Sequence, residues 1–199
     1  MENNSSNLNE QNYNYTNYMP DYSQSNPYEY RVGFGRRFFA YILDYIIYTL
    51  IFLVALVLTG KINQVVSLAS SATIDINEIT EISKSILPLA LLVSLIYYSL
   101  EAFIGATLGK LTLGIKIGNL NRENATIDQL LIRYSIKNIN VLLSLIGLIP
   151  ALSFVNIIGS IFGFVVFIGF FFIFSEKKQA LHDKIANTAV YYNDEIINN

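Results

Sequence analysis

Apolar residues are gathered into three long stretches that are separated by polar and charged segments. The first stretch runs from about residue 34 to 59, and the second from about residue 86 to 108. Because an α-helix rises about 1.5 Å per residue, roughly 20 apolar residues cross the hydrocarbon core of a bilayer, so each stretch predicts one spanning helix. Pro88 falls in the first turn of the second predicted helix, where a missing N–H is tolerated.

The third apolar stretch, residues 139–174, is too long for a single crossing of the bilayer. Pro150, Ser153 and Asn156 lie near its middle and indicate a turn. We therefore expect two short helices in a hairpin, which either spans the bilayer or re-enters on the same side. The predicted fold is an all-α integral membrane bundle of about four transmembrane helices, with helices three and four forming this short hairpin.

Shorter elements are predicted between and after the spans. Residues 73–85 fit a short amphipathic helix at the membrane surface. Apolar positions alternate over residues 113–117, which is typical of a strand, and residues 188–192 are its candidate partner. Thr126 and Gln129 resemble a capping box that begins an amphipathic helix. The sequence thus predicts a small cytoplasmic appendage with a strand and an amphipathic helix.

Composition agrees with a membrane protein and removes several other classes. Hydrophobic residues make up 53% of the chain and charged residues only 14%, against roughly 25% charged residues in a soluble domain. The net charge of −2 does not favour nucleic acid, and the lack of cysteine excludes disulfides and thiolate metal sites. Residues 1–30 are rich in Asn and Tyr and predict a disordered cytoplasmic tail, followed by a transmembrane domain over 31–192 and a polar C-terminal tail over 193–199.

Basic residues are distributed unevenly between the two sides of the predicted spans. Only Lys61 and Lys84 lie on one side. The others precede the first span, follow the second or follow the last: Arg31, Arg36, Arg37, Lys110, Lys116, Arg122, Arg133, Lys137, Lys177, Lys178 and Lys184. Because loops rich in Lys and Arg remain in the cytoplasm, we expect both termini there and the protein in the cell membrane.

Three segments in order along the chain carry a family resemblance. They are GFGRRFFAYILD at 33–44, ATLGK followed by LGIKI within 106–117, and QALHDKIANT at 179–188. Together they resemble the RDD family of membrane proteins from about residue 31 to 192, including its arginine at the start of the first helix and its aspartates, here Asp44 and Asp183. Leu108 stands where the family usually has proline, and Asn187 where it usually has glycine. The resemblance implies a multi-pass membrane domain of generally undefined molecular function, with transport suspected.

Asp44 lies inside the first predicted span, where an ionised carboxylate needs a partner or water. Arg37, Tyr41, Asp44 and Tyr48 follow helical spacing and share one face of that span. Glu101 is the corresponding acidic residue of the second span. The candidate ion or proton site comprises Arg37, Tyr41, Asp44, Tyr97 and Glu101.

The two spans run antiparallel, so both carboxylates are expected roughly 12–14 Å from the cytoplasmic border. At similar depth, Asp44 and Glu101 are positioned to face each other, and carboxylate with tyrosine oxygens suits a hard cation or a proton. A structural alternative is that Asp44 pairs with Arg37 and that a tyrosine or Arg133 caps Glu101. Both interpretations are open from the sequence.

Lys110 and Asp183 belong to a cytoplasmic motif whose expected role is structural. Asp183 follows His182 directly, and adjacent helical residues diverge, so the two are not a prearranged catalytic dyad. No serine elbow, metal-ligand cluster or phosphate loop is present in the sequence. We therefore do not expect an enzyme, a cofactor or a resident metal.

The leading functional hypothesis is a small transporter that exchanges a cation for a proton, with Na⁺/H⁺ exchange favoured. Four short helices are few for alternating access, so a homo-oligomer is expected. The alternative is a non-catalytic membrane scaffold or assembly partner that binds an unidentified protein through its cytoplasmic face. The expected partners are thus the lipid bilayer, Na⁺ or H⁺, another copy of the chain or that protein, and no nucleic acid.

Overall fold

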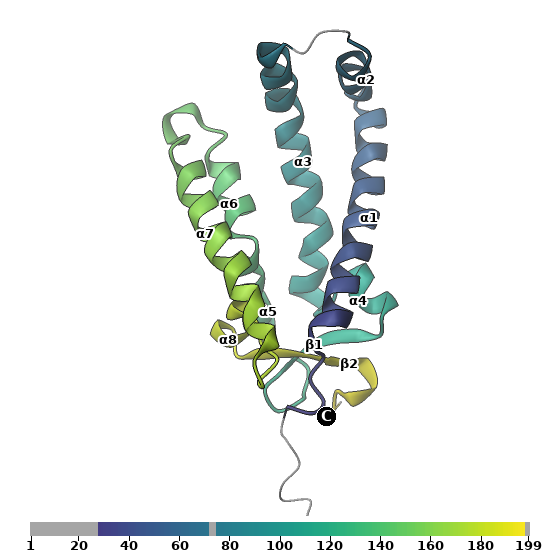
Figure 1. The fold of residues 1–199 in the computed structure, drawn as a ribbon, viewed down its shortest axis with the longest axis vertical. Coiled ribbons are helices and arrows are strands. Elements are labelled where there is room, and N and C mark those ends of the chain that lie inside the picture. Colours follow the sequence, from purple (N-terminus) through teal and green to yellow (C-terminus); the bar gives the residue numbers. More distant parts are fainter. Residues whose placement is uncertain (1–27, 72–74, 198–199) are drawn as a thin grey trace, which may run out of the picture.

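The computed structural model describes residues 28–71 and 75–197, and it is mainly helical (Figure 1). Its α-helices are α1 (Phe34–Leu58), α2 (Ile62–Ser70), α3 (Ile76–Ile104), α4 (Leu108–Thr112), α5 (Ile127–Lys137), α6 (Ile139–Ile146), α7 (Val155–Phe170) and α8 (Leu181–Ile185). The described residues also contain three short 3₁₀ helices, η3 (Pro150–Leu152), η4 (Phe171–Phe174) and η5 (Asn193–Glu195). They contain two strands, β1 (Ile115–Asn119) and β2 (Thr188–Tyr192).

Three helical segments are long and apolar enough to cross a membrane: Phe34–Leu58, Ile76–Ile104 and Val155–Phe174. α1 and α3 run antiparallel side by side, and α6 and α7 form a second hairpin next to them (Figure 1). The eight residues of α6 span only about 12 Å, too little to cross a bilayer alone, although α6 follows α5 after the single residue Asn138. The predicted hairpin is present, and a fourth full span stays a prediction.

The second span begins earlier than predicted. α3 starts at Ile76, so the surface helix expected over 73–85 is instead the first part of α3. Asp75 fixes this start, because its carboxylate accepts the N–H of Asn77 at 2.8 Å. Pro88 therefore lies inside the helix and not in its first turn, and it leaves one carbonyl of the preceding turn without its usual N–H. Residues 72–74 lie outside the described residues.

The best-buried apolar side chains lie at the basic end of the bundle, around the two-stranded sheet. β1 and β2 pair, as the sequence predicts, and the pairing is antiparallel with Ile117 opposite Val190. The strand starts at residue 115 and not 113, because Gly114 adopts a positive φ of 63° in the turn that follows α4. The core here consists of Val32, Ala40, Ile115, Ile117, Leu130 and Val190.

The capping box that begins α5 is confirmed: Thr126 accepts the N–H of Gln129, and Gln129 accepts the N–H of Thr126. After β2, residues 193–197 fold back over the sheet, and Ile196 is buried against Tyr191. Residues 1–27 of the predicted tail, and residues 198–199, lie outside the described residues.

Candidate functional site

Asp44 lies in the first half of α1 and is only 4% exposed. Its carboxylate accepts three hydrogen bonds: from the Tyr97 hydroxyl at 2.7 Å, the Thr107 hydroxyl at 2.5 Å and the Gly109 N–H at 2.8 Å. No lysine, arginine or histidine forms an ion pair with Asp44 within residues 28–71 and 75–197. This carboxylate is therefore held by neutral donors from α3, from α4 and from the residue before α4.

The break between α3 and α4 brings Thr107 and Gly109 to Asp44. α3 ends at Gly105, whose φ of 74° is a left-handed conformation that glycine adopts freely. The chain then turns, and α4 begins directly against α1. At Gly109 an added Cβ would lie 2.5 Å from the Ala40 carbonyl oxygen and 2.8 Å from the Asp44 nitrogen, so only glycine allows this approach.

Glu101 lies near the end of α3, is 1% exposed, and has entirely different partners. Its carboxylate accepts Lys110 Nζ at 2.7 Å and Lys137 Nζ at 2.6 Å, and it also binds Arg133 Nη1. Three cations from α4 and α5 thus surround one buried carboxylate. Ionic bonds of this kind hold α4 and α5 to the end of α3.

Asp183 of α8 is fully buried and continues this ionic network. Arg37 Nη1 lies 2.6 Å from Asp183 Oδ2, and Arg133 Nη2 lies 2.7 Å from Oδ1. Because Arg133 also binds Glu101, it links α5 to both α3 and α8. Arg37 donates further hydrogen bonds to the carbonyls of Val32 and Lys178. The network therefore joins the start of α1 to the segment after the last span.

The cations of the network differ in how firmly they hold a proton. Burial lowers the pKa of Lys110 to about 7, with Glu101 opposing that shift and Lys137 and Arg133 adding to it. For Arg133, burial alone would lower the pKa, but Asp183 and Glu101 outweigh it and raise the pKa above its ordinary value. Arg133 therefore keeps its charge near neutral pH, whereas Lys110 titrates there.

Asp183 and His182 have fixed charge states near neutral pH. Burial alone would raise the pKa of Asp183, but Arg133 and Arg37 lower it well below its ordinary value. Burial lowers the pKa of His182 to about 3, so its ring is neutral. Since Arg133 donates to His182 Nε2 across 3.2 Å, the ring hydrogen belongs on Nδ1, which has no partner in the described part of the chain.

Asp44 and Tyr97, two of the five predicted site residues, lie in direct contact. The carboxylates of Asp44 and Glu101 share no hydrogen-bond donor in the described residues, so no side chain bridges them, and a single site that contains both stays a prediction. Arg37 contacts Asp183 and not Asp44. The two predicted motif residues also lie in the ionic network, where Lys110 binds Glu101 and Asp183 binds both arginines.

Tyr41 is 59% exposed and has no hydrogen bond with these groups in the described residues. The buried face of α1 contains Arg37, Ala40 and Asp44, and Tyr41 is turned about 100° from Ala40 around the helix axis. The predicted polar stripe is therefore buried at Arg37 and Asp44 but not at Tyr41.

Sequence reasoning missed Thr107, Gly109 and Lys137 as partners of the two carboxylates. In the sequence Thr107 and Gly109 belong only to a family motif. The available signal is Gly105, a residue type that often ends a helix, followed by Thr107 two residues later and by Gly109 four residues later.

Three apolar helices of spanning length, packed around buried charges at one end, define a multi-pass membrane protein. The sequence profile of the RDD family matches residues 31–187, so the chain belongs to the RDD family. Comparison with curated proteins and with solved structures finds no match.

Proposed function

We propose that this RDD-family protein is a small transporter that exchanges a cation for a proton, with Na⁺ as the favoured cation. Asp44 is the residue that binds either ion in this proposal. The observation behind it is the environment of the Asp44 carboxylate: it is 4% exposed within a spanning helix, and no cation of the described chain neutralises it. Ionisable residues buried in spans mark ion and proton pathways more often than other positions do.

The partners of Asp44 suit both bound states. Hydroxyl oxygens of Tyr97 and Thr107 donate to the ionised carboxylate, and by turning their hydrogens away they offer oxygen ligands to a hard cation. A proton on Asp44 would be held by the same oxygens. Transporters often bind cations where a membrane helix is interrupted, and Asp44 faces the interruption between α3 and α4.

The ionic network around Glu101 and Asp183 supports a different role, namely to hold the helix ends together. All four of its cations, Arg37, Lys110, Arg133 and Lys137, are bound to these two carboxylates. Because they are engaged there, none of them neutralises Asp44. The network thereby leaves Asp44 available for an exchangeable ion.

The proposed orientation places this end of the molecule in the cytoplasm of the cell. The start of α1, both strands and α8 lie at the same end of the bundle, whereas α2 lies at the other (Figure 1). Loops rich in Lys and Arg favour the cytoplasmic side. A homo-oligomer in the cell membrane would supply the helix surface that alternating access requires.

Na⁺-driven proton movement in proteoliposomes tests this proposal. We expect a Na⁺ gradient to move protons through the wild-type chain and not through Asp44→Asn. Glu81→Gln is the matched control, because it removes a carboxylate of α3 that is 73% exposed and, among the described residues, ion-paired with Lys84 alone. This variant should keep the flux. Equal flux through Asp44→Asn and wild type would refute the role of Asp44. No flux through correctly inserted wild type, with Na⁺, K⁺ or Li⁺, would refute cation exchange.

A membrane scaffold is the second candidate function, and one observation favours it. The most thoroughly buried side chains form a folded platform at the basic end, made of the sheet, α5 and α8. A scaffold would keep its activity in Asp44→Asn and lose it when exposed residues of 176–192 are changed. Cross-linking to neighbouring proteins in native membranes would separate the two candidate functions. It would compare wild type with Asp44→Asn and with variants of exposed residues in 176–192.

A further inference from the structure

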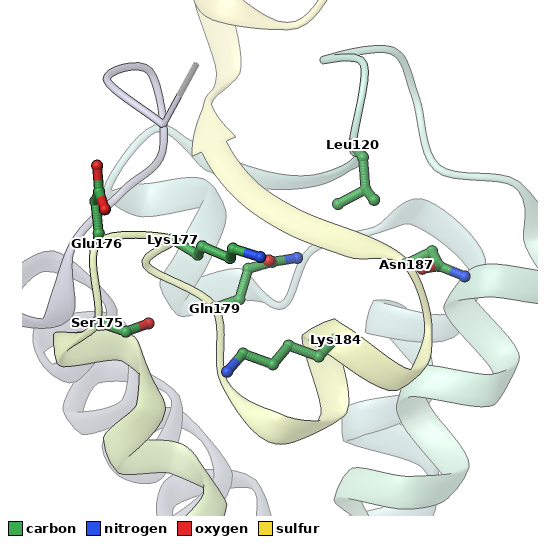
Figure 2. Close-up of a pocket in the computed structure, with 7 residues that line it drawn as sticks. All are labelled: Leu120, Ser175, Glu176, Lys177, Gln179, Lys184 and Asn187. Carbon is green, nitrogen blue, oxygen red and sulfur yellow. The ribbon is translucent and has the colours of Figure 1, made fainter. Parts of the chain in front are cut away.

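An open pocket of about 580 Å³ lies on the basic platform, beside the segment that follows the last span (Figure 2). Ser175, Lys177, Gln179 and Lys184 contribute side chains to its lining, and Leu120 lies across from them. Its volume lies within the range of ordinary small-molecule sites, roughly 300–1,000 Å³. None of these residues belongs to the Asp44 site or to the ionic network.

The charge of this pocket is positive. The side chains of Lys177 and Lys184 extend toward the same space, whereas the carboxylate of Glu176 points away from both (Figure 2). Neither lysine forms an ion pair within the part of the chain that the structure describes. Lys184 Nζ lies 4.4 Å from the ring centroid of Phe172 and so adjoins the last turn of the apolar segment.

A further cation, Arg31, is bound to the backbone of the pocket lining. Arg31 is 6% exposed and donates from Nη1 to the Lys177 carbonyl at 3.0 Å. It has no carboxylate partner among the described residues, and its Nε has no hydrogen-bond acceptor there. Arg31 therefore holds the backbone turn that contains Lys177. Its charge also adds to the positive potential of the pocket, which favours a bound anion.

The position of the pocket along the chain indicates the source of that anion. Ser175 follows directly on the candidate span Val155–Phe174. Phe172 and Phe174 are 47% and 65% exposed, and apolar rings so exposed at the end of a span are suited to lie in lipid. The pocket is thus at the depth where phospholipid headgroups meet the protein, and basic pockets at this depth bind anionic headgroups.

We propose that this pocket binds the phosphate group of an anionic phospholipid, with Lys177 and Lys184 as its two cationic ligands. The acyl chains would run along the exposed face of α7 and η4, next to Phe172. The proposal is independent of ion exchange at Asp44.

Thermal unfolding of the full chain in neutral detergent tests it, because a ligand that binds only the folded state raises Tm. The probes are phosphatidylglycerol, phosphatidylcholine and soluble glycerol phosphate. We expect phosphatidylglycerol alone to raise Tm. In the double variant Lys177→Gln, Lys184→Gln its apparent affinity should fall on the order of tenfold or more, since each lysine near the headgroup contributes to binding.

The matched control, Lys84→Gln with Lys116→Gln, removes two lysines elsewhere and should keep the wild-type shift. The double variant Lys177→Arg, Lys184→Arg keeps both charges, so phosphatidylglycerol should also raise its Tm. This variant separates lost lipid binding from a folding defect. If phosphatidylglycerol raised Tm with the same apparent affinity in Lys177→Gln, Lys184→Gln as in the control Lys84→Gln, Lys116→Gln, the proposal would be overturned. A shift with glycerol phosphate as large as with the lipid would overturn the lipid assignment and leave a soluble-phosphate site.

Discussion

Asp44 and Glu101 are both buried carboxylates in the spanning helices, and their surroundings differ completely. Glu101 is bound by three cations, whereas Asp44 accepts hydrogen bonds from two hydroxyl groups and one backbone N–H. Gly109 and Lys110 are neighbours in α4, yet the first contacts Asp44 and the second Glu101. The same short helix therefore serves both environments.

In the proposed function, this difference separates a structural carboxylate, Glu101, from one that exchanges its ion, Asp44. Buried charges are stable only when paired or hydrogen-bonded, and removing one partner of a buried pair is costly. Glu101 and Asp183 meet this requirement with arginine and lysine, which fixes them. Asp44 meets it with groups that reorient by rotation of a hydroxyl hydrogen. Burial alone would not have distinguished the two, since Asp44 is 4% and Glu101 1% exposed.

The largest effect is expected from Asp183→Asn. This change leaves Arg37 and Arg133 buried with one charge fewer between them, so the free energy of unfolding should fall by about 3–5 kcal/mol. Asp44→Asn removes no ion pair and should cost only about 1 kcal/mol. Equilibrium unfolding by SDS in mixed micelles measures both, with the exposed Asp194→Asn as control. Equal losses at positions 183 and 44 would break the comparison between them.

An intermediate effect is expected from Gly109→Ala. The added methyl group would meet the backbone of Ala40 and Asp44 at 2.5–2.8 Å, so α4 must move and unfolding should become easier by about 1–3 kcal/mol. Gly35→Ala is the control, because nothing lies within 4 Å of its added Cβ, and it should be neutral or slightly stabilising. A stable Gly109→Ala variant with unchanged flux would show that the contact of α4 with Asp44 is dispensable.

The smallest effect is a pH dependence from Lys110. Its pKa of about 7 in the folded chain lies below the ordinary 10.5, so the unfolded chain binds more protons between these values. Stability should therefore rise with pH across that window, by at most about 1.4 kcal/mol per pH unit. Between pH 7 and pH 8 the rise is therefore at most about 1.4 kcal/mol. Lys110→Met should abolish this rise and Lys84→Met should keep it, as measured by unfolding at these two pH values. A flat profile in wild type would show that Lys110 holds its proton as an exposed lysine does.

Much of the fold follows from local patterns in the sequence. Hydropathy predicts the spans, alternation predicts the pairing of β1 with β2, and Thr126 with Gln129 predicts the start of α5. Hydropathy places the start of α3 too late, because it records where a helix is apolar and not where it is capped. The cap is Asp75, eleven residues before the apolar run.

The candidate site was predictable only in part. Helical spacing placed Asp44 and Tyr97 on inward faces, but it did not distinguish Tyr41 from Ala40, since both lie close to that face. The pairing of Arg37 with Asp183 joins residues 146 positions apart. Such a contact depends on how the last span packs on α5 and on the sheet, and no local pattern contains that information.

The central claim is that Asp44 holds an exchangeable ion while Glu101 does not. Proton release on Na⁺ addition to detergent-solubilised protein in weak buffer tests it most directly. We predict release from wild type and from Glu81→Gln, saturating with Na⁺, and none from Asp44→Asn that retains its fold. Undiminished Na⁺-dependent release from folded Asp44→Asn would contradict the account and place the exchangeable proton elsewhere, with Lys110 the first residue to examine.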